Sequence, residues 1–471
     1  MTFGACPASM DAARAQIPAE RAAVLEFGCA SVSVPLVHDN PSGERLSLAV
    51  ARVRHRSPVD PVGSLVLLSG GPGQSGLELA STAATLLPMG LLQRFDVVTY
   101  DPRGVGESAP INCGTTPDDA SVDVPIDMRT AAGVGTMTAA NRRFSTVCAE
   151  RLGARAGDFS TIAAVRDLDL LREALGERQL TAIGYSYGAK VAAQYAHRFP
   201  DKVRALVVDA PTDPRTAWPA ALRPQVRGFE EAFDEYASGC TARPDCARLD
   251  GGPRAFAIDL IARLFAQPVA SRRPQDTELA NGYDVVDAIL ASIYDPVRWP
   301  DLDAGLYEAR YGDAGTLFGL VESVQGPPVT DPSAPDPADA GFVINCTDAP
   351  PGPTDAEVMA AAATIVAESP LFGPAMTRQL TGCREWSPPR VLLELPTYSG
   401  ALPVVVVGTV HDPATPYSGA VSMTEVLGKA TLVTYEGQGH TAMGRSPCID
   451  AYLTAYLANL TIPPNGARCP A

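Results

Sequence analysis

Lysine is scarce in this sequence and occurs only at Lys190, Lys202 and Lys429, whereas arginine is abundant. Acidic residues nevertheless outnumber basic ones by 53 to 37, so the formal net charge is −16. Such an acidic chain offers no surface for the phosphates of nucleic acid or for an anionic membrane, so we expect neither as a partner. Long hydrophobic runs are missing as well. No uninterrupted apolar stretch reaches the roughly 20 residues of a membrane-spanning helix, and we therefore expect no integral membrane segment.

The amino terminus shows no targeting segment. Residues 1–6 (MTFGAC) lack the basic stretch and the following apolar stretch of a secretory leader. Two interpretations follow from this. The protein is either cytoplasmic, or it is a processed chain that has received a new initiator methionine.

Cysteine, in contrast, is plentiful: the chain has ten cysteines but only five histidines, and no Cys-x-x-Cys pair. This pattern does not indicate metal ligation, and we expect neither a metal nor an organic cofactor. Disulfides persist only in oxidising compartments, so bridges would favour a secreted or cell-envelope protein, with the cytoplasm and buried free thiols as the alternative. Sequence alone does not establish the pairing. Bridges between neighbours in the sequence would be Cys6–Cys29, Cys113–Cys148, Cys240–Cys246, Cys346–Cys383 and Cys448–Cys469.

The composition is that of a globular protein, and 471 residues are enough for two structural units. Short apolar runs alternate with helix-like segments over the first 210 residues, which predicts an α/β fold with a mostly parallel sheet flanked by helices. A helical period is present at residues 161–175. The expected strands are residues 46–53, 64–68, 95–100, 180–183 and 205–208.

The pattern changes between residues 211 and 396, where Pro, Ala and Asp are frequent and no strong strand run occurs. Helices are expected at 229–237 and 255–265, and a Pro-rich loop at 326–337. Strands resume at 403–407 and 431–435, before a helix at 447–457. We therefore expect an α/β core in two parts, 1–210 and 397–471, interrupted by a mostly helical cap at 211–396.

The strongest chemical motif is Gly184-Tyr185-Ser186-Tyr187-Gly188, between an apolar run and an Ala-rich helical segment. A serine hydroxyl is a weak nucleophile unless it is exposed beside a base. The G-x-S-x-G spacing achieves this at a tight strand–turn–helix junction, since the glycines let the backbone pass closely. We predict Ser186 as the nucleophile, and a plain glycine-flanked turn is the alternative.

The partners of such a serine follow in the order acid, then histidine, after later strands. His440 follows a late strand through a glycine turn, whereas His38 and His55 come too early and His197 lies on the helix after the serine. His411 directly precedes Asp412, and that position suits the acid loop better than the base. We predict His440 as base and Asp412 as the acid that fixes its tautomer.

Catalysis also needs donors for the oxyanion. One is expected to be the backbone N–H of Tyr187, and the second that of Gly71 in the loop Gly70-Gly71-Pro72-Gly73. A phosphate-binding role for this loop is the alternative. The loop lacks the Lys-Ser/Thr of a P-loop, which argues against that role.

Together these segments resemble the proline-iminopeptidase-like branch of the α/β hydrolases, and most closely the secreted tripeptidyl aminopeptidases and related cell-envelope serine proteases of actinobacteria. The matching segments span nearly the whole chain in family order. Two positions depart from the family: Ser69 stands where a His is common, and Asp209-Ala210-Pro211 replaces a frequent Asp-Gly. The matching segments are residues 29–36 (CASVSVPL), 70–76 (GGPGQSG), 101–108 (DPRGVGES), 184–188 (GYSYG), 346–348 (CTD), 383–386 (CREW), 412–416 (DPATP) and 439–441 (GHT).

The resemblance implies a hydrolase core with a helical cap, an extracytoplasmic location, and cleavage of peptides or peptide-like amides from the N-terminal side. It also supports the bridge Cys346–Cys383. An aminopeptidase must bind a free α-ammonium group, which calls for a carboxylate near the cap. Candidates by location are Asp348, Glu230 and Glu231, with solvated surface charges as the alternative for the two glutamates.

The predicted function is thus a serine hydrolase that acts through an acyl-enzyme, of the tripeptidyl or prolyl aminopeptidase type. One alternative is a carboxylesterase or amidase on bulky small molecules, because fold and triad define the reaction class better than the substrate. The other is a non-catalytic binding protein on a hydrolase fold. A monomer is the default expectation for the oligomeric state.

Overall fold

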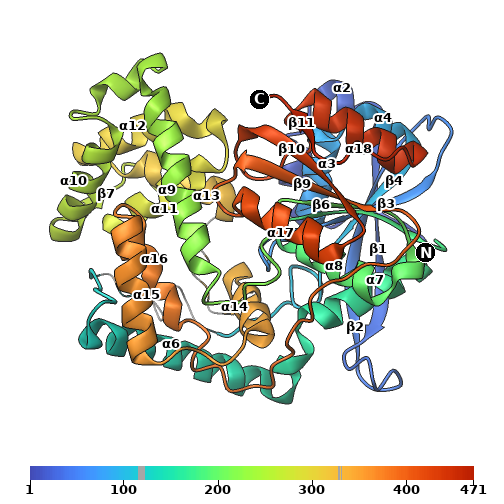
Figure 1. Ribbon diagram of the computed structural model, residues 1–471, viewed down its shortest axis with the longest axis horizontal. Helices are drawn as coiled ribbons and strands as arrows, with labels where there is room; N and C mark the ends of the chain where they lie inside the picture. Colours follow the sequence, from blue (N-terminus) through green and yellow to red (C-terminus); the bar gives the residue numbers. More distant parts are fainter. Residues whose placement is uncertain (115–121, 123, 327–328, 330, 332) are drawn as a thin grey trace.

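A twisted central sheet forms one half of the molecule (Figure 1). The computed structural model describes residues 1–114, 122, 124–326, 329, 331 and 333–471. Within these residues the main sheet has nine strands in the order β1-β2-β4-β3-β5-β6-β9-β10-β11. The strands are β1 Leu25–Pro35, β2 Arg45–His55, β3 Gly63–Leu68, β4 Phe95–Tyr100, β5 Leu180–Tyr185, β6 Val203–Asp209, β9 Val404–His411, β10 Ala430–Gln438 and β11 Ala467–Cys469.

The strands run parallel from β4 to β11, whereas β2 pairs antiparallel with both β1 and β4. Every strand run that the sequence predicts is present. The structure adds β1, which forms a long hairpin with β2. Because the parallel strands point the same way, the chain leaves β3, β5, β6, β9 and β10 at one edge of the sheet, where an α/β protein places its ligand.

Helices cover both faces of the sheet, because neighbouring strand residues face opposite sides. Val98 packs in one hydrophobic cluster with helices α7, α8 and α17, and Val97 packs in the other with α3, α4 and α18. Because both faces of the sheet are buried, the parallel strands appear in the sequence as continuous apolar runs. The helices are α3 Gly76–Leu86, α4 Met89–Arg94, α7 Thr161–Ala174, α8 Tyr187–Arg198, α17 Tyr417–Leu427 and α18 Pro447–Asn459.

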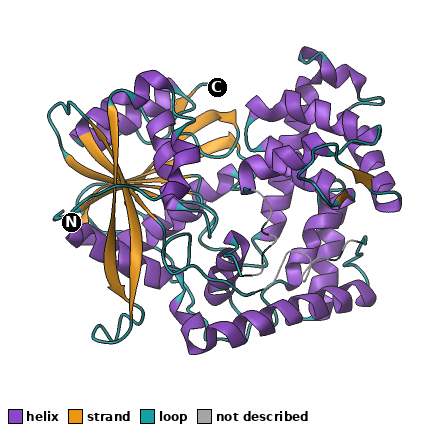
Figure 2. Ribbon diagram, turned by 180° about the vertical axis from the view of Figure 1, so that it is seen from behind, coloured by secondary structure: helices purple, strands orange, loops and turns teal. Residues whose placement is uncertain are grey.

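The other half of the molecule is almost entirely helical (Figure 2) and has a hydrophobic cluster of its own. It contains a small antiparallel pair, β7 Val269–Ala270 and β8 Leu279–Ala280. We refer to this half as the cap. Its helices are α9 Leu222–Ser238, α10 Pro253–Ala266, α11 Gly282–Ile293, α12 Trp299–Arg310, α13 Gly315–Gln325, α15 Asp355–Glu368 and α16 Gly373–Met376.

Two helices pack across the boundary between core and cap that the sequence predicts. Helix α6 (Ala131–Leu152) precedes Ser186 in the sequence, yet its Val134 and Met137 belong to the cap cluster. Helix α14 (Pro337–Asp348) follows the cap helices, yet its Val343 and Ile344 belong to a cluster of the core. The packing therefore crosses the boundaries expected at residues 210 and 396. The Pro-rich loop expected at 326–337 falls partly outside the described residues.

The amino-terminal segment and the loops contain only short helices. Two of them, α1 Asp11–Arg14 and α2 Ala19–Ala22, precede the first strand. The remaining pieces are 3-10 turns, namely η1 Ala8–Met10, η2 Gly153–Asp158, η3 Pro200–Lys202, η4 Gly239–Ala242, η5 Asp245–Arg248, η6 Pro296–Arg298 and η7 Thr377–Thr381.

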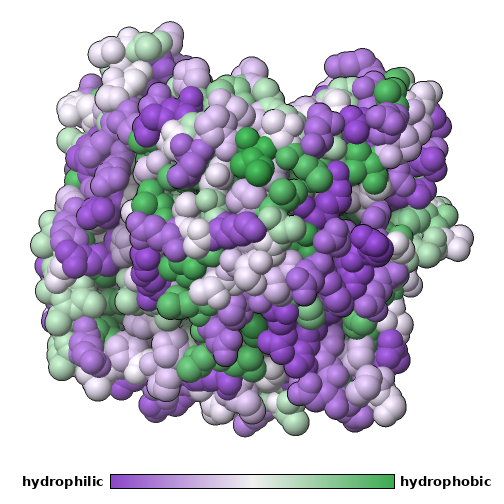
Figure 3. All heavy atoms as spheres, turned by 45° about the vertical axis from the view of Figure 1, so that its right-hand side comes forward, coloured by the Kyte–Doolittle hydropathy of each residue, from purple (hydrophilic) through white to green (hydrophobic). Residues whose placement is uncertain are grey.

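All ten cysteines lie in the described part of the chain, and all of them are paired. The bridges join the nearest neighbours in the sequence: Cys6–Cys29, Cys113–Cys148, Cys240–Cys246, Cys346–Cys383 and Cys448–Cys469. On the face shown in Figure 3, hydrophilic and hydrophobic residues are intermixed. Over the described residues, every helix is too short or too polar to cross a membrane.

Candidate active site

Ser186 lies between the end of β5 and the first residue of α8, with φ 55° and ψ −114°. This left-handed backbone costs a non-glycine residue free energy, and the neighbours hold it in place. A Cβ on Gly184 would lie 2.2 Å from the Gly188 carbonyl oxygen, and one on Gly188 would lie 2.2 Å from the Leu68 carbonyl oxygen. Strand and helix can therefore meet this closely only because both positions are glycine.

His440 and Asp412 lie at the ends of adjacent parallel strands, β10 and β9. The Nδ1 atom of His440 lies 2.9 Å from Asp412 Oδ1 and 3.0 Å from Oδ2. Asp412 is held in turn by the backbone N–H groups of Ala414 and Thr415, which donate to Oδ1 at 2.9 Å. The hydroxyl of Thr415 lies 3.4 Å from the same His440 nitrogen. The structure thus orients the imidazole through Nδ1 and leaves Nε2 for another partner.

Burial and charge act in opposite directions on His440. Burial lowers the pKa of its imidazole, but the negative charge and hydrogen bond of Asp412, with a further contribution from Asp209, outweigh burial and raise the pKa. The side chain retains 13% exposure, whereas that of Asp412 is fully buried. This arrangement stabilises the imidazolium that forms when a histidine accepts a proton from a serine.

Asp209, at the end of β6, joins the serine and histidine segments. Its backbone oxygen accepts from Ser186 N–H at 3.0 Å, and its carboxylate accepts from the N–H groups of Ala442 and Met443 at 3.1 Å. Burial raises the pKa of Asp209 to about 6, although those backbone hydrogen bonds oppose the rise. Sequence reasoning noted this position only as a departure from the family. Its place at the end of a buried strand was the signal that it bears on the site.

The structure brings Ser186 and His440 to the same edge of the sheet through Asp209. In the described part of the chain, no hydrogen bond joins the Ser186 hydroxyl to His440 itself. Catalytic hydrogen bonds are often long before substrate binds and shorten in the complex.

The glycine loop after β3 lies directly beside the serine. A Cβ on Gly70 would lie 3.4 Å from the Ser186 Cβ. Gly71 has φ +102°, a conformation that favours glycine, and Tyr187 is the first residue of α8, where backbone N–H groups have no acceptor inside the helix. Two backbone donors are thus available next to the serine, as an oxyanion site needs.

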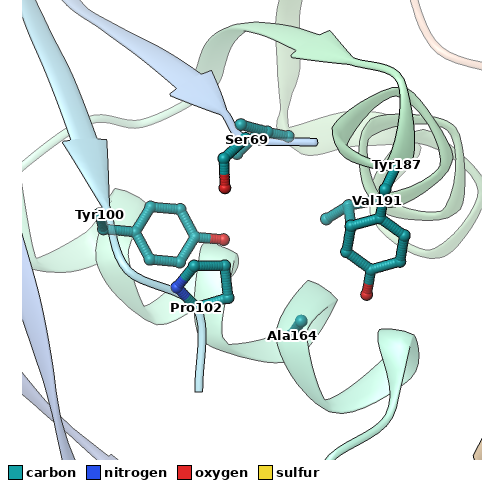
Figure 4. A pocket seen from close by; sticks show the side chains of 7 residues that line it. Ser69, Tyr100, Pro102, Ala164, Tyr187 and Val191 are labelled. Carbon is teal, nitrogen blue, oxygen red and sulfur yellow. The ribbon is translucent and has the colours of Figure 1, made fainter. Parts of the chain in front are cut away.

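A small pocket lies beneath this loop, and the Ser69 and Tyr100 hydroxyls point toward it (Figure 4). The Ser69 hydroxyl donates to the Gln74 carbonyl at 2.9 Å and thereby closes the glycine loop. The family that the sequence resembles commonly has a His at this position. The Tyr187 hydroxyl lies 2.8 Å from that of Thr161. The pocket is lined by Leu68, Ser69, Tyr100, Pro102, Ala164, Tyr187 and Val191.

The cap contacts the histidine and acid loops directly. The carbonyl of Tyr294, at the C-terminal end of α11, accepts the backbone N–H of His440 at 3.1 Å, and the Tyr294 ring packs edge-on at 5.3 Å from the imidazole. On α9, a Cβ at Gly228 would lie 2.8 Å from the Pro413 carbonyl oxygen. The cap therefore forms part of the wall around His440.

The three carboxylates proposed for the substrate ammonium group are not placed together. Asp348 accepts from the backbone N–H and the hydroxyl of Thr161, and burial raises its pKa to about 6 while Lys190 opposes the rise. Glu230 is buried in the cap, where Arg254 and two backbone N–H groups donate to it. Glu231 is exposed and pairs with Arg227 at 3.3 Å. All three are satisfied by other groups of the protein.

Two residues of the segment 101–108 have structural roles. The buried Asp101 accepts from the Ser75 hydroxyl at 2.7 Å and from two backbone N–H groups, which ties the glycine loop to the end of β4. The buried Arg103 forms an ion pair with Asp167 at 2.6 Å. Among the described residues, no three His, Cys, Asp or Glu side chains are grouped as a metal site would need.

Comparison with known proteins places the sequence among hydrolases. Residues 63–250 match the family described as alpha/beta hydrolase fold, and residues 369–469 match the family described as TAP-like protein. Serine protease Hip1 of Mycobacterium tuberculosis is 33% identical over 461 residues, which cover 94% of this chain and 87% of that protein.

Two further relatives are similar over the same extent. Carboxylesterase B of Mycobacterium tuberculosis is 33% identical over 458 residues, covering 94% of this chain and 86% of its own. Tripeptidyl aminopeptidase of Streptomyces coelicolor is 29% identical over 483 residues, covering 96% and 86%. The similarity therefore includes the cap as well as the segments around Ser186, Asp412 and His440.

Proposed function

The chain belongs to the α/β-hydrolase family and is a serine hydrolase, and from that premise we propose that it is an exopeptidase that cleaves peptides from the N-terminal side. The observation that carries the hydrolase chemistry is the histidine held by both oxygens of a buried carboxylate, beside a serine on a strained strand–helix turn. The similarity to a serine protease and to a tripeptidyl aminopeptidase supports a peptide as the substrate. A tripeptidyl or prolyl aminopeptidase is the activity that this site and the relatives support best.

In the proposed reaction, the Ser186 hydroxyl attacks the scissile carbonyl and His440 accepts its proton on Nε2. The oxyanion that forms accepts from the N–H groups of Tyr187 and Gly71. When the C–N bond breaks, His440 protonates the leaving amine and the acyl group remains on Ser186. Water then attacks the ester with His440 as base, which releases the acid and restores the serine.

Asp412 acts throughout by keeping the Nδ1–H of His440 directed at its carboxylate. The buried carboxylate stabilises the imidazolium in both halves of the reaction. The Ser186 side chain needs no large movement, because its backbone already holds it between the glycine loop and the end of β6. The protein therefore contributes orientation and fixed dipoles to the reaction.

The second candidate is a carboxylesterase, favoured by Carboxylesterase B at the same 33% identity. Both activities would use the same acyl-enzyme, so the leaving group distinguishes them. We expect kcat/KM to be higher for a tripeptidyl amide than for a single-residue amide. The test measures kcat/KM for a short acyl ester beside the two amides. A preference for the ester over every peptide amide would select the carboxylesterase.

We also propose that the protein acts outside the cytoplasm on soluble peptides. Five disulfides, including the buried Cys346–Cys383, support an oxidising compartment. For the chain itself we propose three parts, residues 1–210 and 397–471 for the core and 211–396 for the cap. Helices α6 and α14 join the two.

The test of the nucleophile is labelling with a fluorophosphonate probe. We expect the native protein to be labelled and Ser186→Ala not to be labelled, with kcat lowered on the order of 10⁴-fold or more. The matched control is Ser81→Ala, which removes a buried hydroxyl that lacks a hydrogen-bond partner within the described residues. Equal labelling of native protein and Ser186→Ala would assign the chemistry to another residue.

A further inference from the structure

We propose that Asp287, on cap helix α11, binds the α-ammonium group of the substrate and thereby sets the released fragment at three residues. The inference rests on the proposed exopeptidase function and names the residue that would make it specific for a free N-terminus. It assigns this role to a residue that differs from the three carboxylates expected from the sequence.

Helix α11 has two distinct sides. Val285, Val286 and Ile289 on one side are buried in the cap cluster. The other side carries Asp287, Leu290 and Tyr294 at the 3–4-residue spacing of one helix face, and none of the three is fully buried. Tyr294 at the end of this stripe contacts His440 through its ring and its carbonyl. The stripe therefore leads from the histidine along the surface of the cap.

Asp287 combines exposure with a strong desolvation effect. Its side chain is exposed to solvent, yet burial raises its pKa to about 6, with a further rise from Asp284 and an opposing effect from Arg378. A carboxylate that is poorly solvated binds a cation more strongly than one in open water.

Asp287 is also free to accept a ligand, because it has no hydrogen bond or ion pair to any described residue. Arg378, the cation whose charge lowers the pKa of Asp287, is engaged elsewhere. Its guanidinium lies 3.4 Å from the centre of the Tyr283 ring and donates to the backbone carbonyls of Ala375 and Val122. A substrate ammonium group would thus meet a carboxylate that is not paired with any residue the structure describes.

The spacing along the helix corresponds to a definite peptide length. Asp287 and Tyr294 are seven residues apart, which at 1.5 Å per residue is about 10 Å along the helix axis. An extended chain of three residues also spans about 10 Å at 3.3 Å per residue. A peptide whose scissile carbonyl lies beside His440 would therefore place its ammonium group at Asp287 when three residues precede the cleaved bond.

Other carboxylates in this region are already paired. Glu235 on α9 accepts from the Gln438 amide at 3.3 Å and lies 3.9 Å from His411 Nδ1. Asp348 is bonded to Thr161, and Glu230 to Arg254. Glu235 is the strongest rival because it is half-exposed and close to the histidine loop, so it enters the test.

The test compares Asp287→Asn with the native protein on a tripeptidyl 4-nitroanilide, on the same peptide with an acetylated N-terminus, and on a short acyl ester. We expect kcat/KM for the free peptide to fall roughly 100-fold, mainly through KM, because a charge-assisted hydrogen bond is lost. Values for the acetylated peptide and the ester should change less than about threefold, since neither uses the carboxylate. Asp287→Glu, which keeps the charge, should retain the preference for a free N-terminus.

Two further variants make the result specific. Glu231→Gln removes an exposed cap carboxylate and should behave as native, whereas Glu235→Gln tests the rival. With native protein, tripeptidyl amides should exceed dipeptidyl and tetrapeptidyl amides in kcat/KM.

Three outcomes would overturn the assignment. One is that Asp287→Asn keeps the native preference for the free peptide over the acetylated one. The second is that Glu235→Gln loses this preference, and the third is a native preference for two or four residues. If native protein hydrolyses the ester but none of the peptide amides, the exopeptidase proposal is itself wrong and Asp287 has no ammonium group to bind.

Discussion

The core and the cap contribute to the site in different ways. The core supplies the groups proposed for bond breaking, all at the ends of neighbouring strands: Ser186 after β5, Asp412 after β9 and His440 after β10. The cap supplies surfaces around them, through the Tyr294 ring against His440 and through α9 at Gly228 against the acid loop. We therefore expect strand order to position the groups for the reaction chemistry and the packing of the cap helices to determine substrate selection.

This difference gives each half a distinct mutational signature. A change in the core should lower the rate on every substrate, because all substrates share the acyl-enzyme. A change in the cap should lower the rate on some substrates and spare others. The predictions below test this division, starting with the largest expected effect.

The largest effect is expected for Asp412→Asn. An asparagine keeps an oxygen for the Ala414 and Thr415 N–H groups, so folding should be preserved, but it no longer holds His440 in the productive tautomer. We expect kcat to fall about 10⁴-fold for peptide amides and esters alike. Steady-state rates on both substrate types check this. A loss confined to one substrate would contradict the assignment of Asp412 to the chemistry.

The next largest effect concerns two disulfides of very different loop length. Cys346–Cys383 closes a separation of 37 residues at the junction of α14 with the core, and Cys240–Cys246 closes six residues within the cap. By loop entropy, replacing both cysteines with serine should cost about 4 kcal/mol of unfolding free energy for the first pair and about 2 kcal/mol for the second. Urea unfolding at equal protein concentration measures both, and equal losses would argue against a constraint on the unfolded chain.

Much of the core could be predicted from the sequence, because its constraints are local. Apolar runs followed by Gly-rich turns indicate buried parallel strands with functional loops. The turn that carries Ser186 could be predicted for the same reason, because a Cβ on Gly184 or Gly188 would collide with the backbone. The strands, the order of serine, acid and histidine, and the α/β-hydrolase fold follow from such short segments.

The cap was less predictable, because its contacts join segments far apart in sequence. The first half of helix α6 packs into the cap through Val134 and Met137, whereas its Cys148 packs in the core, and nothing in the pattern of the helix indicates these two partners. Glu230 resembles a surface charge in the sequence but is buried against Arg254. Asp287 has no motif around it; only the stripe that ends at Tyr294 connects it to His440. Asp209 was missed for a related reason, since its partners Ala442 and Met443 lie more than 230 residues away.

A smaller effect is expected where cap and core touch. Gly228→Ala would place a Cβ 2.8 Å from the Pro413 carbonyl oxygen and 3.4 Å from that of Asp412, so α9 or the acid loop must shift. We expect kcat/KM to fall roughly 10- to 100-fold, because small displacements of a catalytic group are costly. The peptide should be affected more than the ester, since we expect the longer substrate to contact the cap.

The control for this variant is Gly135→Ala on α6, where a Cβ would meet nothing within 4 Å. An alanine there should leave the rates unchanged and slightly stabilise the helix. If Gly228→Ala lowers peptide and ester rates by the same factor, the α9 contact acts through the triad alone and the cap has no separate role at this point.

The smallest effect is a shift of the acid limb of the pH profile, which should depend on the core and not on the cap. His440 must be neutral to accept the serine proton, and the charge of Asp412 and Asp209 raises its pKa in spite of burial. On the ester, kcat/KM should therefore fall with decreasing pH through a midpoint above the ~6.5 of an ordinary histidine. Asp209→Asn removes one of the two negative charges and should move this midpoint to lower pH, whereas Glu231→Gln, an exposed cap change, should leave it in place. A midpoint that moved with Glu231→Gln and not with Asp209→Asn would reverse the division between the two halves.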